Sequence, residues 1–556
     1  MKKLALILLV VVMSATLILS GCAQKPAQVT GDLAKDQTLK MDLGVSEPET
    51  LDPAMQQGVA EFNVATMMYE GLTRMDDKNQ PYQGVAEKWT VSADLLTYTF
   101  NLRKNAKWTN GDPVTAKDFE WSWKRAIDPR TGSPYAYQMY YIKGAEAANT
   151  LDPKKDEAKI KPALDAVGIK VVDDYTLQVT LAAPASYWLG LTSFPTYFPV
   201  HRATVEKLGS DKWATEAANF VTNGPFKMTG WTHKSMITME KNTKYWDAKD
   251  VVLKKITIAL VDDSKTELTM WESGQTDFTE GYPAAEIDRL KKENKLTILP
   301  YLGTYYYSFN VKKAPFDNAK VRQAFSLAIN RGDIVNKILK AGQIPALAFV
   351  PPGIPDATAG SDFRKTGGDF YKDNDLAAAN KLLDDAGYKD RSKIPTIEIL
   401  YNTNPNHKTI AEAIQEMWSK GLNIPKEKIK LNSQEWGVYL SSRTKTHDFQ
   451  VARAGWIGDY VDPMTFLDMF MTDNGNNDPQ YANKTYDDLL NAAKKTGDQK
   501  VRMDNMHKAE KILVDDMVIA PIYYYVHIVL QKPYVKSVAI NTIGNTDFVH
   551  AWIAKH

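Results

Sequence analysis

Short runs in which apolar and polar residues alternate recur along the chain, and they predict β-strands. The clearest runs are residues 98–102, 176–181, 255–258 and 397–400. Between such runs, apolar residues recur at helical spacing, as in residues 318–329, and Thr115 and Asp118 form a capping-box pattern before another helix. Strands that alternate with amphipathic helices predict a mixed α/β body, and the chain is long enough for two or more lobes.

The first residues predict a secretion signal that takes no part in the fold. Two lysines and an apolar run over residues 4–19 precede the small residues Ser20 and Gly21, and Cys22, the only cysteine, follows directly. The apolar run is shorter than the ~20 residues of a transmembrane helix. The pattern resembles a bacterial lipoprotein signal, which implies cleavage after residue 21 and acylation of Cys22. The alternatives are a transmembrane anchor or a buried structural cysteine.

The next segment, residues 22–37, is small and polar and has no apolar period. It predicts a flexible tether that holds a folded body off the lipid surface. Anchoring through Cys22 places that body on the outer face of the cytoplasmic membrane, without spanning it.

Composition narrows the choice of ligand. The formal net charge is +1, and removal of the leader's two lysines makes it −1 (1 − 2 = −1), which gives no electrostatic case for nucleic acid. The 13 Trp, 27 Tyr and 18 Phe residues supply stiff, amphipathic surfaces of the kind that line binding clefts as well as cores. A ligand is therefore expected to be recognised by local contacts.

Known catalytic and metal-binding motifs are not found in the sequence. It has no HExxH, GxSxG or GxxxxGK[ST] pattern, and none of its eight histidines forms an i, i+4 pair. Residues 473–478 are acidic and amide-rich but lack the spacing and closing glutamate of an EF-hand, so a polar turn is favoured over a cation loop. The sequence thus predicts no enzyme, no metal site and no cofactor.

The segment with the most chemistry is residues 449–463, which reads as strand, bend and helix. Asp462 and Pro463 suit the N-cap and first position of a helix that begins near Met464. Asp459, between Gly458 and Tyr460, has no such structural explanation. It can receive a ligand ammonium through charge-assisted hydrogen bonds, or it can close an Asx turn, and spacing alone does not decide between these roles.

This segment resembles the peptide-binding core of oligopeptide-binding proteins from ABC importers, family 5 of the extracellular solute-binding proteins. The resemblance extends in the family's order over nearly all of the mature chain. It is carried by Leu-Arg-Lys-Asn-Ala-Lys-Trp at 102–108, Gly-Asp-Pro-Val-Thr-Ala-Lys-Asp-Phe at 111–119, and the segments 221–226, 303–307, 400–403, 434–436 and 521–526.

The resemblance implies a periplasmic-binding-protein-like fold, with two lobes, a hinge and an interlobe cleft, plus an extra α/β domain. The implied domains are a discontinuous domain I, domain II and domain III. Their expected limits are 38–69 with 196–302 and 526–556, then 70–195, then 303–525.

The resemblance also implies a site in the cleft. Asp459 would hold the α-ammonium of a peptide, and Arg453, Arg443 and His407 would receive peptide carboxylates at different ligand lengths. Backbone groups of Gly455 and Ile457 would lie beside the peptide. The remaining expected site residues are Trp456, Trp436, Leu440, Tyr301, Tyr306 and Tyr525 as walls, with Asn402, Gly58 and Val59. For each aromatic residue the alternative is core packing, and for each arginine it is an ordinary surface ion pair.

Three positions depart from the family pattern. Gln57 stands where well-known relatives carry glutamate, Leu339 where one has lysine, and Ser308 where the family has an acidic residue. If Lys340 does not substitute for the lysine, preferred peptide length or terminus handling is expected to differ. Ser308 is expected to make one pocket less suited to basic side chains.

The function implied is a lipid-anchored, monomeric receptor that closes over short peptides and delivers them to an ABC permease, with separate ATPase subunits supplying energy. Alternatives on the same fold are receptors for a dipeptide, a signalling peptide, a metal chelate or haem. An extracellular peptidase or cell-wall hydrolase is an alternative of another class, and the missing motifs count against it.

Overall fold

The computed structural model describes residues 31–185 and 187–556. Cys22 and the leader lie outside the described residues, so the lipoprotein prediction is not addressed by the coordinates. No helix within the described part is both long and apolar enough to cross a membrane.

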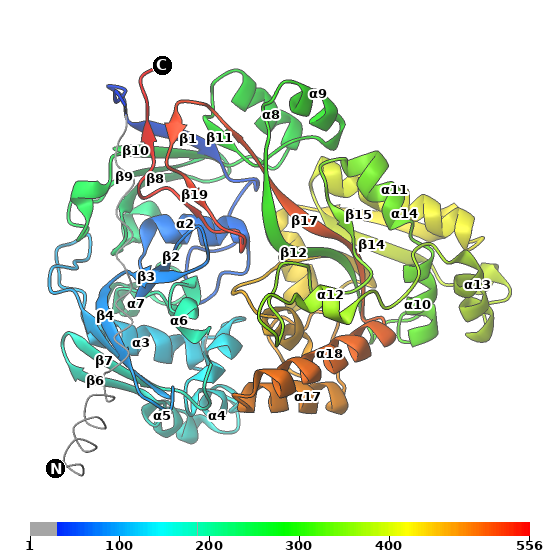
Figure 1. Ribbon diagram of the computed structural model, residues 1–556, viewed down its shortest axis with the longest axis horizontal. Helices are drawn as coiled ribbons and strands as arrows, with labels where there is room; N and C mark the ends of the chain where they lie inside the picture. Colours follow the sequence, from blue (N-terminus) through cyan, green and yellow to red (C-terminus); the bar gives the residue numbers. More distant parts are fainter. Residues whose placement is uncertain (1–30, 186) are drawn as a thin grey trace, which may run out of the picture.

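One large twisted sheet runs through both halves of the molecule (Figure 1), in the order β15-β14-β16-β12-β17-β11-β1-β10-β9-β8. We call the half that contains β1 and β8–β11 the first lobe and the half that contains β14–β16 the second lobe. The first-lobe strands are β1 Thr38–Asp42, β8 Phe226–Thr232, β9 Met236–Lys241, β10 Lys255–Ala259 and β11 Phe278–Thr279. The second-lobe strands are β14 Ile397–Asn402, β15 Ile429–Gln434 and β16 Val451–Ile457.

Two long strands, β12 (Thr297–Phe309) and β17 (Ile519–Gln531), connect the lobes. They pair antiparallel with each other, and the register shifts between Pro300 and Thr304. In Figure 1 both strands pass from the first lobe into the second. A shift in register marks a place where a ladder bends, so the two lobes share a continuous sheet with an irregularity at the crossing point.

A second, smaller sheet belongs to the first lobe and has the order β4-β5-β7-β6. Its strands are β4 Ala86–Val91, β5 Thr97–Leu102, β6 Ile169–Asp173 and β7 Thr176–Thr180. The inward residues of β5, including Phe100, pack with α3 (Ala116–Ile127), whose predicted capping box between Thr115 and Asp118 is confirmed. The other helices of this lobe are α2 Val59–Met68, α4 Ala145–Asn149, α5 Glu157–Asp165, α6 Trp188–Leu191, α7 Arg202–Leu208, α8 Ser264–Glu272 and α9 Ile287–Lys292, with short strands β2 Thr73–Met75 and β3 Pro81–Gln83.

Helices cover the second lobe on both sides of its sheet. The predicted helix over 318–329 is confirmed as α10 (Ala319–Leu327), and Asn318 caps it by accepting a hydrogen bond from the Lys320 N–H at 3.0 Å. The other elements are α11 Arg331–Asp333, β13 Ile344–Pro345, α12 Phe363–Gly367, α13 Leu376–Asp385, α14 Pro405–Gly421, α15 Trp436–Leu440, α16 Met464–Leu467, α17 Lys484–Lys495 and α18 Gln499–Asp515.

The end of the predicted tether is part of the fold, so the prediction of a flexible segment up to residue 37 is wrong at its end. Gln37 is buried, donates to the carbonyls of Ala34 and Ile553, and accepts from the Ile553 N–H. Leu33 forms a bridge with Ala554. The sequence gives no apolar signal here because the segment is held by backbone and amide hydrogen bonds. Strands β18 Val535–Lys536, β19 Ala539–Ile540, β20 Thr546–Asp547 and β21 Trp552–Ile553 complete the C-terminal part.

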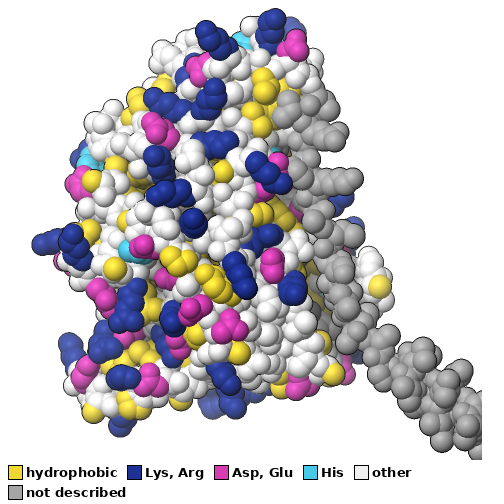
Figure 2. Space-filling model, turned by 90° about the vertical axis from the view of Figure 1, so that its left-hand side faces the viewer, with side chains coloured by type: hydrophobic (Ala, Val, Ile, Leu, Met, Phe, Trp, Pro, Cys, Tyr) yellow, Lys and Arg dark blue, Asp and Glu magenta, His cyan; other side chains and the backbone are white. Residues whose placement is uncertain are grey.

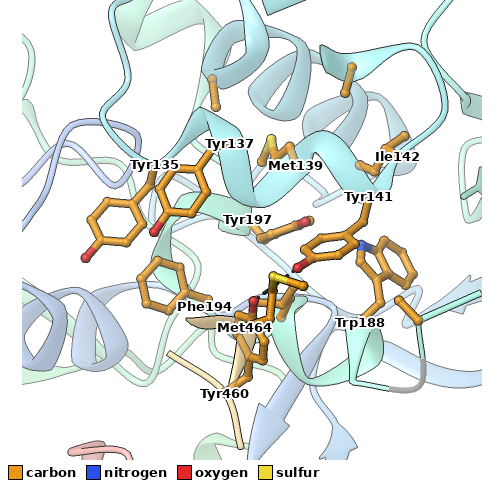
Figure 3. Packing of buried hydrophobic residues seen from close by; sticks show 14 of the residues in the cluster. Tyr135, Tyr137, Met139, Tyr141, Ile142, Trp188, Phe194, Tyr197, Tyr460 and Met464 are labelled. Atoms are coloured by element: carbon orange, nitrogen blue, oxygen red, sulfur yellow. Dashed lines mark hydrogen bonds between the residues drawn. The ribbon is translucent and has the colours of Figure 1, made fainter. Parts of the chain in front are cut away.

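The largest hydrophobic cluster joins the small sheet of the first lobe to the second lobe. Figure 3 shows part of it, where Tyr135, Tyr137 and Tyr141 of the first lobe face Tyr460 and Met464 of the second. On the surface, lysines and arginines are interspersed with acidic residues over the face shown in Figure 2, consistent with a net charge near zero.

Candidate binding site

Strand β16 has one paired edge and one edge that is mostly free. Its antiparallel ladder with β12 runs the whole length, from Val451 to Ile457. The parallel ladder with β14 on the other side covers only Val451 and Ala452. Within the described part of the chain, the outer edge of β16 from Arg453 onward therefore carries no strand, and an exposed strand edge is a template for an extended ligand.

Asp459 lies in the bend that follows this edge. The residue is 9% exposed, and its carboxylate accepts hydrogen bonds from the Gln138 amide at 2.7 Å and the Thr465 hydroxyl at 3.3 Å, both at Oδ2. In an Asx turn the carboxylate would accept from a nearby backbone N–H, whereas both donors here are side chains. Burial, reinforced by the nearby Asp468 carboxylate, raises the pKa of Asp459 well above its usual value. Within residues 31–185 and 187–556 no basic side chain pairs with it, so the carboxylate is available to a cation from outside.

The neighbouring Asp462 is in the opposite situation. Its two oxygens accept from the Arg502 guanidinium at 2.6 Å each, and Oδ1 also accepts from the Met464 N–H at 2.9 Å. The helix begins at Met464, as the sequence predicts, although its N-cap is Pro463 and not Asp462. Asp462 is a structural residue, as predicted, and its charge is compensated.

At the other end of the free edge lies a group of polar side chains around Arg453. The Arg453 guanidinium lies 4.8 Å from the Tyr305 ring centre and donates to Asn402 Oδ1 at 3.3 Å and to the Tyr525 hydroxyl at 3.1 Å. None of these partners is a carboxylate, so the expected alternative of a surface ion pair does not apply to Arg453.

His407 and Arg443 flank this group in different states. His407 Nδ1 lies 3.4 Å from the Tyr305 hydroxyl, and burial together with the Arg453 charge lowers the pKa of His407 well below its usual value. His407 is thus neutral without ligand, whereas the sequence reasoning grouped it with the cations. Arg443 lies over the Tyr439 ring, and its Nε is 2.9 Å from Asp478 Oδ2, so it belongs to a buried ion pair.

The expected wall residues divide into two sets. Leu440 and Tyr306 are 1% and 2% exposed and pack in hydrophobic clusters, Tyr306 against Phe349 and Phe470. Core packing, the alternative given for the aromatic residues, describes Tyr306, and Leu440 is packed in the same way. The resemblance implies a wall role for both residues, and that role stays a prediction.

The other expected wall residues lie at the junction between lobes. Trp456 stacks on Tyr135 with ring centres 6.0 Å apart, and its indole N–H is buried without a partner among the described residues. Tyr301 stacks on His527 and lies 5.8 Å from the ring of Tyr525.

Trp436 meets the N-terminal segment that contains the predicted residues Gly58 and Val59. Its indole donates to Glu61 Oε1 at 3.0 Å. Gly58 is the N-cap of α2, and a Cβ there would lie 2.0 Å from Glu61 Oε2 and 3.0 Å from the Trp436 ring. Gly58 is therefore required for the close approach of the two lobes, and Val59 is the first residue of α2.

The three departures have different surroundings. Gln57 reaches across the lobes to Thr444 and Asn476, at 3.3 and 3.4 Å. Leu339 is a core residue, and the half-buried Lys340 pairs through its ammonium with Asp288 at 2.8 Å. The Ser308 hydroxyl is buried without a partner among the described residues. A cavity of about 650 Å³ adjoins Gln57, between residues of the first lobe and the loops around Thr444 and Gly475.

Two residues at the site were missed by sequence reasoning. Gln138 lies in the 3₁₀ segment Ala136–Tyr141 and touches Asp459. Glu61 is fully buried, and burial raises its pKa. The only sequence signal near Gln138 is the dense run of tyrosines around it, which by itself indicates packing. For Glu61 the first-turn position suggests helix capping and not a contact with Trp436.

Comparison with known proteins gives consistent matches. The family model for bacterial extracellular solute-binding proteins, family 5 (middle), matches residues 80–478. The chain is 39% identical to the oligopeptide-binding protein OppA of Bacillus subtilis over 551 residues, 97% of each chain. It is 41% identical to the dipeptide-binding protein DppE of the same organism over 506 residues, 90% of this chain and 89% of the relative. The crystal structure of Haemophilus influenzae OppA in complex with RPPGFSPFR superposes with a TM-score of 0.85 at 35% identity, covering 94% of this chain and all of the other.

Proposed function

The chain belongs to the bacterial extracellular solute-binding proteins of family 5, and we propose that it is a receptor that captures short peptides between its lobes and passes them to an ABC permease. The observation that carries the proposal is a buried carboxylate, Asp459, which has no basic partner in the described part of the chain and follows the free edge of β16. As a member of a family of binding proteins, the chain is not an enzyme.

The proposed ligand lies along the free edge of β16. Its backbone pairs with that edge, which makes binding insensitive to side-chain identity, and its α-ammonium meets Asp459. Asp459 follows the end of β16 at Ile457, and Arg453 lies four residues before that end, about 13 Å in an extended strand. A peptide of about four residues would therefore bring its carboxylate near Arg453. His407 and Arg443 would then serve ligands of other lengths, and Gly455 and Ile457 would contribute backbone groups.

Closure of the lobes is proposed to enclose the peptide. Cross-lobe contacts support a closed state: Lys445 pairs with Glu49 at 2.8 Å, and Tyr187 stacks on Tyr460 with ring centres 4.8 Å apart. The ligand adds contacts that exist only when both lobes are in place, and this differential affinity favours the closed form that a permease can recognise.

We further propose the domain limits given above and a lipid anchor at Cys22. The limits at 302/303 and 525/526 fall within β12 and β17, near the register shift between Pro300 and Thr304, where a hinge is expected. An acylated Cys22 would hold the receptor on the outer face of the cytoplasmic membrane, close to the permease.

The test of the function is calorimetric titration of the soluble body, stripped of copurified ligand, with alanine peptides of two to six residues and their N-acetylated forms. We expect the free peptides to bind and acetylation to weaken binding by at least about 30-fold, because it removes the charge and donors that Asp459 receives. The length series separates dipeptide from oligopeptide preference. Equal binding of free and acetylated peptides would contradict the assigned ammonium site, and no binding of either would contradict the peptide receptor.

Binding is also expected to release a proton. Free Asp459 has a raised pKa, and a bound ammonium lowers it, so the complex holds fewer protons than the separate partners. Affinity should therefore rise with pH, by up to about tenfold per pH unit, while free Asp459 remains protonated and the peptide amine remains charged. Calorimetry in buffers of different ionisation enthalpy measures the proton count, with C-terminally amidated peptides to avoid a contribution from His407. Proton uptake in place of release would rule out this linkage.

A further inference from the structure

Among the residues that the structure describes, Gln138 is the only one of the first lobe that donates a hydrogen bond to the Asp459 carboxylate. It is 1% exposed, and its backbone carbonyl accepts a hydrogen bond from the Tyr197 hydroxyl at 2.7 Å, which holds the 3₁₀ segment in place. Figure 3 shows Tyr137 and Met139 on this segment, with Tyr197 next to it and Tyr460 on the opposite side. The side chain is thus directed at the second lobe by a rigid, aromatic-rich support.

The two ends of the Gln138 amide are in different situations. Nε2 donates to Asp459 Oδ2 at 2.7 Å, whereas Oε1 is fully buried and has no hydrogen-bond partner among the described residues. The assignment of the two amide atoms follows from the second hydrogen bond at the same oxygen: Asp459 Oδ2 also accepts from the Thr465 hydroxyl, so it acts as an acceptor and faces the N–H end of the amide. A buried acceptor without a donor is unfavourable, and so it indicates that a donor is missing.

A peptide α-ammonium supplies the missing donors. It carries three N–H groups, while Asp459 Oδ2 already accepts from Gln138 and Thr465. Gln138 Oε1 belongs to the same amide that contacts the carboxylate, so it lies beside the place where the ammonium would sit. One cation can then satisfy both the uncompensated carboxylate and the unpartnered amide oxygen.

We propose that Gln138 Oε1 is the second acceptor for the ligand ammonium, so that the ammonium site is divided between the lobes and is complete only on closure. This inference rests on the proposed peptide-binding function and adds to it. In the open form Asp459 would offer the cation a single acceptor group. The amine end of the ligand would thereby favour closure, because it bridges Asp459 of one lobe and Gln138 of the other.

The alternative is that Gln138 only supports Asp459 through its N–H. Removal of a supporting residue should weaken the binding of free and N-acetylated peptides alike, or lower stability. Loss of an ammonium acceptor should weaken only the free peptides. The ratio of the two dissociation constants therefore separates the two roles.

The experiment compares Gln138→Met, which keeps the size but has no acceptor, with wild type. The probes are tetraalanine and N-acetyl-tetraalanine, the weaker one measured by competition. We call the dissociation constant of the acetylated peptide divided by that of the free peptide the acetylation ratio. We expect this ratio to fall about tenfold in Gln138→Met, while affinity for the acetylated peptide changes less than about threefold. Gln138→Glu retains an acceptor and, when protonated, a donor, so at pH 6 it should keep most of the ratio. Gln178→Met, on the outer face of the small sheet, is the control, and thermal denaturation verifies folding.

The outcomes are distinguishable. Suppose that Gln138→Met keeps the wild-type acetylation ratio while Asp459→Asn loses its preference for the free amine. This result overturns the role of Gln138 and leaves the peptide receptor intact. Equal losses in Gln138→Met and Gln138→Glu overturn it as well, because the glutamate keeps the acceptor. If the acetylation ratio were unchanged in both Gln138→Met and Asp459→Asn, the proposed ammonium site itself would be contradicted.

Discussion

Replacing Asp459 with asparagine is expected to weaken the binding of free tetraalanine by about 100-fold, or about 3 kcal/mol. The asparagine keeps the shape and can still accept from Thr465, but it leaves the buried ammonium without a counter-charge. Buried charge pairs lose this much because the remaining ion stays desolvated. Calorimetric titration of both proteins with the same peptide measures the effect.

The same substitution should not destabilise the ligand-free protein. Asp459 has no basic partner among the described residues and burial disfavours its charge, so a neutral amide is an equal or better occupant. Binding of N-acetyl-tetraalanine is the control and should change little. A parallel loss for both peptides, or a marked drop in melting temperature, would mean that Asp459 supports the bend and does not bind the ammonium.

Replacing Asp462 with alanine is expected to lower the free energy of unfolding by about 3–5 kcal/mol, the effect of leaving one partner of a buried ion pair alone. Arg502 would remain under the Tyr187 ring, 5.0 Å from its centre, with its charge uncompensated. The first turn of α16 would also lose the acceptor for the Met464 N–H. Denaturant titration of the ligand-free protein measures the change.

A matched control is available on the surface. Asp488 pairs with Lys484 one turn away on α17, and its side chain is 62% exposed. Asp488→Ala should cost less than about 0.5 kcal/mol because water screens such pairs. If Asp462→Ala were as mild as this control, the Arg502 pair would not be a structural requirement of the bend.

Sequence patterns predict the local structure of this chain well where the signal is local. The capping box at Thr115 and the helix capped by Asn318 are confirmed, because the residues that decide them are a few positions apart. The tether prediction fails near Gln37 because its partner, Ile553, is 516 residues away. Polar segments that are fixed by distant backbone groups look flexible in sequence.

The candidate site shows the same limit. The spacing around Asp462 gives that residue a structural role at the start of a helix. It gives Asp459 no such role, and Asp459 is therefore a candidate for ligand binding. Gln138 is 321 residues from Asp459, so no local pattern relates the two. Leu440 and Asp459 were both expected in the cleft, and only the structure reveals that Leu440 packs in a hydrophobic cluster with Leu400 and Tyr439.

The order of strands in the large sheet also has a consequence for how the protein is made. Strand β1, near the start of the chain, pairs with β10 and β11, and β11 in turn pairs with β17 near the end. Gln37 is held by Ile553 (Figure 1 shows the red C-terminal strands beside blue β1). The first lobe therefore cannot finish its sheet until the last part of the chain has emerged. A translation product truncated before residue 519 would lack β17, and both lobes would be left with an unpaired strand edge.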